Sequence, residues 1–172
     1  MDVTIETGRL RIVPFEMSRL EEYASAFDEE ITKYQYPDPF ASAEAAKEAL
    51  QGFMDLMNQN EMLFLSILTP DGEFVGGVEV HGLQEQYPEL GIWIKKERQQ
   101  KGYAYEALAE TLKFLDGSCH RDWYVYEADI RNTGSMKLVE KFDYRKEGLD
   151  EFETETGKLL RLQRFLIKRH GQ

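Results

Sequence analysis

Apolar side chains recur at every second position in several short segments, and this period is typical of β-strands. In one such segment Leu90, Ile92 and Ile94 alternate with Gly91 and Trp93. Both sets are apolar, so we expect this strand to be covered on two faces and to lie in the middle of a sheet. The same reasoning predicts strands at 9–14, 62–68, 74–81, 123–130, 145–153 and 159–168.

Turn sequences and stretches of helical spacing connect these strands. Residues 69–72 and 155–158 are rich in turn formers and predict two hairpins. Apolar positions three and four apart predict helices at 18–29, 42–57, 102–116 and 133–142, with Ser42 as a cap at the start of the second. The chain has 172 residues and no repeat or linker, so a single domain over 1–172 is expected.

The passage from the strand at 89–95 into the helix at 102–116 has the features of a phosphate-binding turn. A helix start presents backbone N–H groups without intrahelical partners, together with the positive end of the helix dipole. Gly102 stands at this start and would let an anion approach the backbone without a side chain intervening. The segment therefore predicts a cradle for a pyrophosphate, although a glycine here also serves simply to close a tight turn.

At this turn the sequence resembles a known family. Gln99, Gly102 and Ala104 fit the Gln/Arg-x-x-Gly-x-Gly/Ala signature of the GNAT superfamily of acetyl-CoA-dependent N-acetyltransferases. Residues 130–148 are similar to a second segment of that family, with Asn132, Ser135, Leu138 and Lys141 in register. The opening Glu-Thr-Gly-Arg-Leu-Arg-Ile, residues 6–12, looks like the start of GNAT proteins of the RimJ/RimL type.

The resemblance implies a fold and a cofactor. The fold is an α/β (α+β) GNAT-like acyl-CoA N-acyltransferase domain, with a mixed, mostly antiparallel sheet of about seven strands flanked by about four helices. The strands at 89–95 and 123–130 would splay apart, and the pantetheine arm of acetyl-CoA would lie between them. The cofactor-binding residues would be Ile92, Trp93, Ile94, Gln99, Gln100, Lys101, Gly102, Tyr103, Ala104, Asn132 and Lys141. For Asn132, helix capping alone is an equally good explanation.

Amide formation by direct attack requires a proton acceptor for the amine and a donor for the departing thiolate. We expect Glu89 to be the base, acting through water, with Asp38, Glu79 and Glu153 as rivals. An ordinary solvent-facing acid is the alternative for Glu89. Many GNAT enzymes carry a tyrosine acid seven residues after the Asn, a position that is Val139 in this chain.

RimJ/RimL-type members instead have a serine three residues after the Asn, and Ser135 matches it. The expected acid is therefore Ser135, whose hydroxyl can donate to sulfur, although serine in a first helical turn is also a common structural choice. The family's Gly-Phe pair at the end of this helix is Asp143-Tyr144, which departs from the pattern.

The acceptor is expected to meet the loop at 34–40, which is aromatic and stiffened by two prolines. Tyr36, Asp38 and Phe40 are the candidate substrate-binding residues. The alternative is that these aromatic side chains only pack the neighbouring helices onto the sheet.

The composition restricts the classes of ligand, metal and cellular compartment that we expect for this protein. A net charge of −11 disfavours nucleic acid and favours a cationic acceptor such as a protein N-terminus, a polyamine, an aminoglycoside or another small amine. Solubility alone is the alternative explanation of this charge. No apolar run approaches a membrane span, so no membrane partner is expected. The single cysteine, Cys119, and the acidic N-terminus favour the cytoplasm. The histidines, His81, His120 and His170, lack metal-ligand spacing, so no metal is expected.

These observations together predict an N-acetyltransferase that moves acetyl from CoA to a primary amine in a ternary complex, without an acyl-enzyme. A non-catalytic acyl-CoA-binding or sensing module is the alternative, since the family's tyrosine and Gly-Phe pair are missing. Oligomeric state cannot be read from the pattern.

Overall fold

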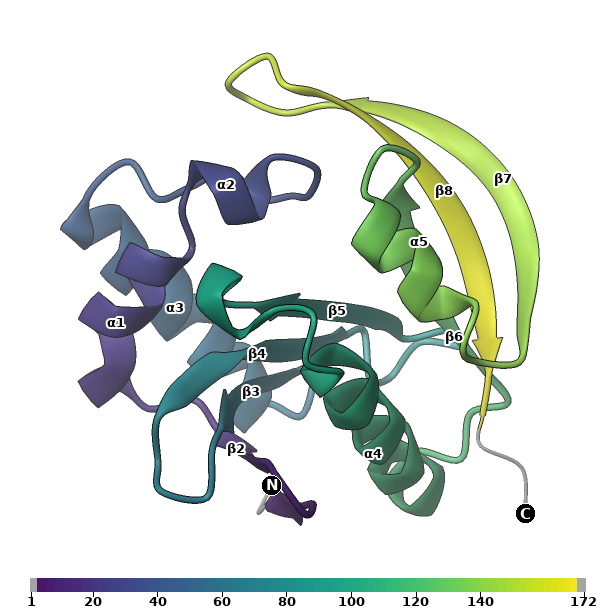
Figure 1. Cartoon of the computed structure of the whole chain (residues 1–172), viewed down its shortest axis with the longest axis horizontal. Coiled ribbons are helices and arrows are strands. Elements are labelled where there is room, and N and C mark those ends of the chain that lie inside the picture. Colours follow the sequence, from purple (N-terminus) through teal and green to yellow (C-terminus); the bar gives the residue numbers. More distant parts are fainter. Residues whose placement is uncertain (1–2, 170–172) are drawn as a thin grey trace.

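A single curved sheet runs through the molecule, as the computed structural model of residues 3–169 shows (Figure 1). Its strand order is β1-β2-β3-β4-β5-β6-β8-β7, and every neighbouring pair is antiparallel except β5 with β6. The strands are β1 (Ile5–Glu6), β2 (Arg11–Pro14), β3 (Leu63–Leu68), β4 (Phe74–His81), β5 (Glu89–Ile94), β6 (Trp123–Asp129), β7 (Tyr144–Glu153) and β8 (Leu159–Lys168). The predicted mixed, mostly antiparallel sheet is confirmed, with β5 in its interior.

Five α-helices accompany the sheet within the described residues. They are α1 (Leu20–Ala26), α2 (Glu29–Thr32), α3 (Ala43–Asn58), α4 (Tyr103–Ser118) and α5 (Thr133–Val139), with single 3₁₀ turns at Met17–Arg19 and Lys96–Arg98. Figure 1 shows α1 and α3 together on one side of the central strands and α4 on the other. Apolar side chains from both layers meet the sheet, and all six residues of β3 are buried between them.

The N-terminal third differs in detail from the sequence prediction. The first strand begins at Arg11 rather than at residue 9, and a short strand, β1, precedes it and pairs with it. The single helix expected at 18–29 is broken into a 3₁₀ turn, α1 and α2. The break falls at Asp28, whose carboxylate accepts hydrogen bonds from the backbone N–H groups of Glu30 and Ile31 (both 3.0 Å) and so starts a new helix.

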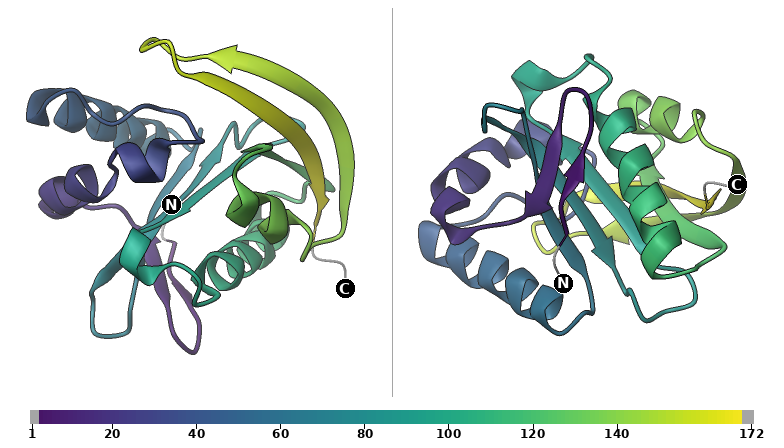
Figure 2. Two further views of the ribbon diagram at one scale, coloured as in Figure 1. Left: turned by 45° about the horizontal axis from the view of Figure 1, so that its top comes forward. Right: turned by 90° about the horizontal axis from the view of Figure 1, so that it is seen from below.

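The C-terminal hairpin arches away from the central strands. Figure 2 shows β7 and β8 curving over the molecule, with their turn reaching back toward the segment that follows α2. Gly157 in this turn has a φ of +82°, which glycine adopts at no steric cost. The predicted turn at 155–158 is thus confirmed, and the hairpin brings the far end of the chain next to its N-terminal third.

The parallel pair β5 and β6 opens a gap in the sheet. The two strands are in register only at Glu89 opposite Val125 and Leu90 opposite Tyr126. Beyond this point β5 continues to Ile94 in partnership with β4 alone. In the described part of the chain, backbone groups on the β6 side of β5 are therefore left without a strand partner, and this divergence positions the site described next.

Candidate active site

Two cavities meet where β5 and β6 diverge. The smaller has a volume of about 450 Å³ and lies toward the start of α4. The larger has a volume of about 940 Å³ and lies toward the 34–40 loop and the start of β5. Gln35, Ile92, Asn132 and Ser135 line both cavities. Two molecules could therefore enter from opposite ends and touch at these four residues.

The start of α4 forms one end of the smaller cavity. Gln100 and Gly102 have φ values of +59° and +81°, and Gly102 is the N-cap residue. No side chain among residues 3–169 caps this helix start, so its first N–H groups remain available to an anion. Of the eleven residues predicted to bind the cofactor, ten line this cavity; the exception is Lys101.

Lys101 is held outside the smaller cavity. Its ammonium donates to the carbonyl of Glu97 (3.2 Å), and its own carbonyl accepts from the guanidinium of Arg9 (2.9 Å). Arg9 also pairs with Glu106 in the first turn of α4 (2.5 Å) and lies over the ring of Tyr103. The turn between β1 and β2 thus stabilises the loop between β5 and α4.

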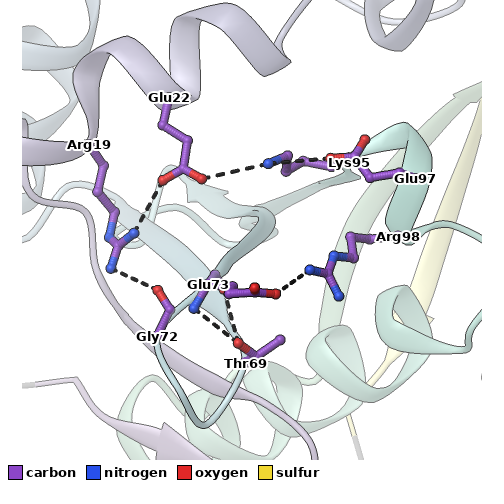
Figure 3. Close-up of polar contacts among 8 residues, drawn as sticks. All are labelled: Arg19, Glu22, Thr69, Gly72, Glu73, Lys95, Glu97 and Arg98. Atoms are coloured by element: carbon purple, nitrogen blue, oxygen red, sulfur yellow. Dashed lines mark hydrogen bonds and ion pairs between the residues drawn. The ribbon is translucent and has the colours of Figure 1, made fainter.

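The other side of this loop is braced by ion pairs, which Figure 3 shows. Arg98, which lines the smaller cavity, pairs with Glu73 from the turn between β3 and β4. Lys95 lies between Glu22 of α1 and Glu97, at 3.6 and 3.4 Å. The segment from β5 to α4 is therefore held by ion pairs to α1 and to the turn between β3 and β4.

Of the three β5 residues predicted to bind the cofactor, only two turn their backbone groups toward the gap. Backbone groups in an antiparallel pair alternate in direction, and Lys95 N–H donates to Val75 in β4. By this alternation Trp93 turns its N–H and C=O toward β4, while Ile92 and Ile94 turn theirs toward the gap. The carbonyl of Ile94 already accepts from the side chain of Gln99 (3.0 Å). Ile92 and the N–H of Ile94 are left to bond a ligand, and the Trp93 backbone is not.

The start of α5 lies across the gap. Asn132 accepts a hydrogen bond from the N–H of Ser135 (3.1 Å), which is the capping role considered from the sequence. Ser135 lies where the two cavities meet and interacts with the hydroxyl of Tyr126 from β6, a buried tyrosine that also lines the larger cavity. Val139 is buried, so the position at which the family carries a tyrosine holds a core side chain in this chain.

Carboxylates and one imidazole line the larger cavity. Glu79, His81, Glu89 and Glu127 come from β4, β5 and β6, whereas the rival base Glu153 does not line the cavity. Glu89 is an exposed residue at the start of β5, but the partial burial of its carboxylate raises its pKa, and the nearby charge of Glu127 raises it further. The pKa of His81 is raised chiefly by its hydrogen bond to Glu79. The cavity thus presents negative charge to a cationic ligand.

The 34–40 loop walls the larger cavity, and the β7–β8 turn holds it in place. Asp38 lines the cavity, but Lys158 contacts one carboxylate oxygen (2.6 Å) and Thr156 donates to the other (2.7 Å). These hydrogen bonds, that of Lys158 first, lower the pKa of Asp38 to about 2. Tyr36 packs edge-on against Phe152 of β7. Asp38 is therefore engaged in closing the cavity rather than free to act as a base.

Phe40 contributes to both interpretations that the sequence left open. It lines the larger cavity and also packs against Tyr23 and Phe27 of the α1 region, at ring distances of 6.4 and 5.8 Å.

Sequence reasoning missed His81 and Tyr126 as site residues. For His81 a signal existed: alternation along β4 places it on the same face as Glu79, and a hairpin partner brings that face to Glu89.

Comparison with known proteins places the chain in a family. The family model described as an acetyltransferase (GNAT) domain matches residues 9–145, well over half of the chain. The chain belongs to the GNAT acetyltransferases. This N-acetyltransferase is 26% identical over 172 residues to the uncharacterized N-acetyltransferase p20 of Bacillus licheniformis, an alignment that covers 96% of this chain and 97% of p20.

Solved structures share its fold. Mycobacterium smegmatis RimJ, in complex with CoA-disulfide, superposes with a TM-score of 0.84 at 18% identity, covering 97% of this chain and 88% of RimJ. Spermidine N-acetyltransferase from Vibrio cholerae, in complex with CoA and spermine, gives a TM-score of 0.81 at 18% identity, covering 95% and 97% of the two chains. The GNAT fold expected from the two sequence segments is thus confirmed.

Two absences hold for residues 3–169. No group of three or more His, Cys, Asp or Glu side chains is arranged to hold a metal ion in this part of the chain. Among the same residues, no helix combines the length and apolarity needed to cross a bilayer. His170 lies outside the described residues.

Proposed function

We propose that this GNAT protein transfers the acetyl group of acetyl-CoA to a cationic primary amine, by direct attack within a ternary complex. The observation that carries the proposal is the junction of the two cavities at Ile92, Asn132 and Ser135. A thioester reaching this point from one side meets an amine entering from the other. The CoA ligands in the RimJ and spermidine N-acetyltransferase structures support the choice of cofactor.

Acetyl-CoA would occupy the smaller cavity. Its pyrophosphate would lie against the uncapped start of α4, where N–H groups and the helix dipole favour negative charge. Its pantetheine amides would bond Ile92 and the N–H of Ile94, as a peptide bonds an exposed strand edge. One of these N–H groups would then polarise the thioester carbonyl.

The amine would occupy the larger cavity, whose carboxylates favour a positive group. We assign Glu89 to the proton-accepting side of the reaction. It would receive the ammonium group and draw off its proton, directly or through water. Ser135 would return a proton to the sulfur of CoA as the C–S bond breaks.

The reaction would not pass through an acyl-enzyme. Cys119 ends α4 as its C-cap residue and lines neither cavity. The chain's one thiol is thus absent from the junction and Ser135 is assigned to proton donation, so the amine itself would attack the thioester.

Release of free thiol from acetyl-CoA across a panel of primary amines tests the function. The panel should include polyamines, aminoglycosides and peptides with free N-termini, with acetylated products confirmed by mass spectrometry. Turnover of at least one amine is expected. Tight CoA binding by calorimetry without turnover of any amine would instead favour the acyl-CoA sensing module.

Glu89→Gln tests the assignment of the base. Turnover should fall steeply at neutral pH and less at high pH, where more of the amine is already neutral. Glu48→Gln is a matched control, because Glu48 is an exposed acid of α3 and does not line either cavity. An unchanged rate in Glu89→Gln would remove this carboxylate from the mechanism.

A further inference from the structure

The wall of the larger cavity carries a set of ionisable groups on one face of the sheet. Glu79 and His81 alternate along β4, and in β5 they face Gly91 and Glu89 respectively. Residues directly opposite in an antiparallel pair project to the same face, so Glu79, His81 and Glu89 do so together. All of them line the larger cavity. Gly91 adds no side chain between Glu89 and the Glu79 carboxylate.

Hydrogen bonds fix the orientation of the imidazole. Glu79 Oε2 lies 3.0 Å from His81 Nε2, and Glu79 Oε1 accepts a hydrogen bond from the Tyr23 hydroxyl (3.1 Å). The Tyr23 hydroxyl in turn accepts from the indole N–H of Trp93 (3.2 Å). Glu79 is therefore anchored to the core by one oxygen and orients His81 with the other.

This arrangement selects one tautomer of His81. A carboxylate acceptor favours a proton on Nε2, which leaves the lone pair on Nδ1. The side chain of His81 is 43% exposed, so a proton taken up at Nδ1 can pass on to water. Within the described residues, Glu79 is the hydrogen-bond partner of this ring.

Building on the proposed function, we propose that His81 is the group that takes the proton from the acceptor ammonium, passed through Glu89 or a water, and that Glu79 is its positioning residue. An N–H bond of the ammonium breaks and an N–H bond forms at His81 Nδ1. The freed lone pair attacks the thioester carbon. As the C–S bond breaks, a second proton leaves the amide nitrogen and reaches the sulfur through Ser135, and the imidazolium releases its proton to water.

An imidazole suits this task better than a carboxylate alone. Unperturbed, its pKa lies about two units closer than that of Glu to the pKa of an alkylammonium, which reduces the uphill proton transfer. The hydrogen bond and charge of Glu79 and the charge of Glu89 raise the pKa of His81, while burial opposes them. Beyond Glu89, the charges of Glu127 on β6 and Arg164 on β8 also act on that carboxylate.

The pH dependence of kcat/KM, measured with the best amine of the panel, tests the proposal. His81 must be neutral to accept a proton, so activity should rise with pH through its raised pKa. In Glu79→Gln the hydrogen-bonded negative charge is lost, so the rise of kcat/KM should occur at lower pH. In His81→Gln this rise of kcat/KM with pH should be absent, and the rate near neutral pH should fall by roughly 100-fold. His120→Gln, in the loop after α4, is the control and should leave the profile unchanged.

NMR titration of the His81 ring gives a readout that a purely structural role would not move. Its pKa should match the pH at which kcat/KM rises in the native protein and shift in the same direction in Glu79→Gln. The proposal would be overturned if kcat/KM rose at the same pH in the native protein and in both variants. It would also be overturned if the pKa of the His81 ring differed from the pH of that rise.

Amine basicity separates this inference from the function itself. 2,2,2-Trifluoroethylamine is largely neutral near pH 7 and needs no base before attack, so His81→Gln should slow its acetylation much less than that of ethylamine. Equal losses for the two amines would exclude His81 as the proton acceptor. If the native protein binds CoA and acetylates no amine, the proposed function is wrong. If it acetylates amines and His81→Gln has no effect, only the role of His81 is wrong.

Discussion

Gly102 has a backbone conformation that its neighbours in α4 do not share. Its φ of +81° lies in the left-handed region, and an added Cβ would lie 3.4 Å from the Arg9 guanidinium. Gly102→Ala should therefore lower the free energy of unfolding by roughly 1 kcal/mol and displace the loop that would bind pyrophosphate. Calorimetry should show weaker CoA binding.

Gly117, near the end of the same helix, provides the matched control. An added Cβ meets no atom within 4 Å there, and its φ is not in the left-handed region. Gly117→Ala should raise the free energy of unfolding by about 0.5–1 kcal/mol and leave CoA affinity unchanged. Equal effects of the two substitutions on CoA binding would argue against a phosphate site at Gly102.

Ser135 can be separated from the cap that holds it. Asn132 bonds the backbone N–H of Ser135, so Ser135→Ala removes the hydroxyl and keeps this hydrogen bond. We expect kcat to fall about 10-fold or more while CoA affinity is retained, because only proton return to sulfur is impaired. Tyr126→Phe is the companion variant, since the Tyr126 hydroxyl interacts with Ser135. Undiminished turnover in Ser135→Ala, with a loss in Tyr126→Phe, would transfer the acid role to the tyrosine.

Individual site residues could be predicted only where a local pattern marks them. Gln99, Gly102 and Asn132 stand at element ends, where they match the two GNAT segments, and all three line the smaller cavity. The orientation of Lys101 depends on Glu97 and Arg9, and that of Asp38 depends on Lys158. Such contacts join distant parts of the chain, and no local pattern contains them.

At the scale of elements, the β7–β8 turn holds the 34–40 loop in place through Lys158. Lys158 pairs with Asp38 and also donates to the carbonyls of Thr32 and Gln35, at 2.8 Å each. Lys158→Met should release the loop, and we expect a higher KM for the amine with little change in CoA affinity. Steady-state kinetics with each substrate varied in turn measures both effects.

Lys146→Met is the control for Lys158→Met, because Lys146 is an exposed residue of β7 outside both cavities. It should leave both KM values unchanged. A loss of CoA affinity in Lys158→Met, rather than of amine affinity, would show that the hairpin supports the smaller cavity instead of walling the larger one.

The sequence allowed long elements to be predicted better than short ones. Periodicity over many residues located α3, α4 and the central strands within a few positions. The two-residue β1 carries too few positions to show a period, and its pairing with β2 depends on tertiary contacts. The break between α1 and α2 depends on one capping side chain, Asp28, inside an otherwise helical spacing.

At the scale of the whole molecule, Asp129 joins three segments of the C-terminal half. Its carboxylate is fully buried at the end of β6 and accepts from the side chain of Arg131 (2.8 and 2.7 Å) and from the backbone N–H of Arg161 in β8 (2.8 Å). Burial acts to raise the pKa of Asp129, but these hydrogen bonds outweigh it and lower the value to about 2. The ionised form is therefore the one that stabilises the fold.

The sign of the pH effect follows from this lowered pKa. An unfolded Asp titrates near 4, so its contribution to stability is complete above that pH and is lost as pH falls toward 2. Asp129→Asn should lower the free energy of unfolding near pH 7 by at most roughly 2 kcal/mol, since Arg131 is partly solvated. Urea denaturation across this pH range should show the difference shrinking as the native carboxyl protonates. Asp150→Asn, on exposed β7, should show neither effect. A deficit for Asp129→Asn that persists unchanged near pH 2 would mean that the charge of Asp129 contributes nothing and that only its shape matters.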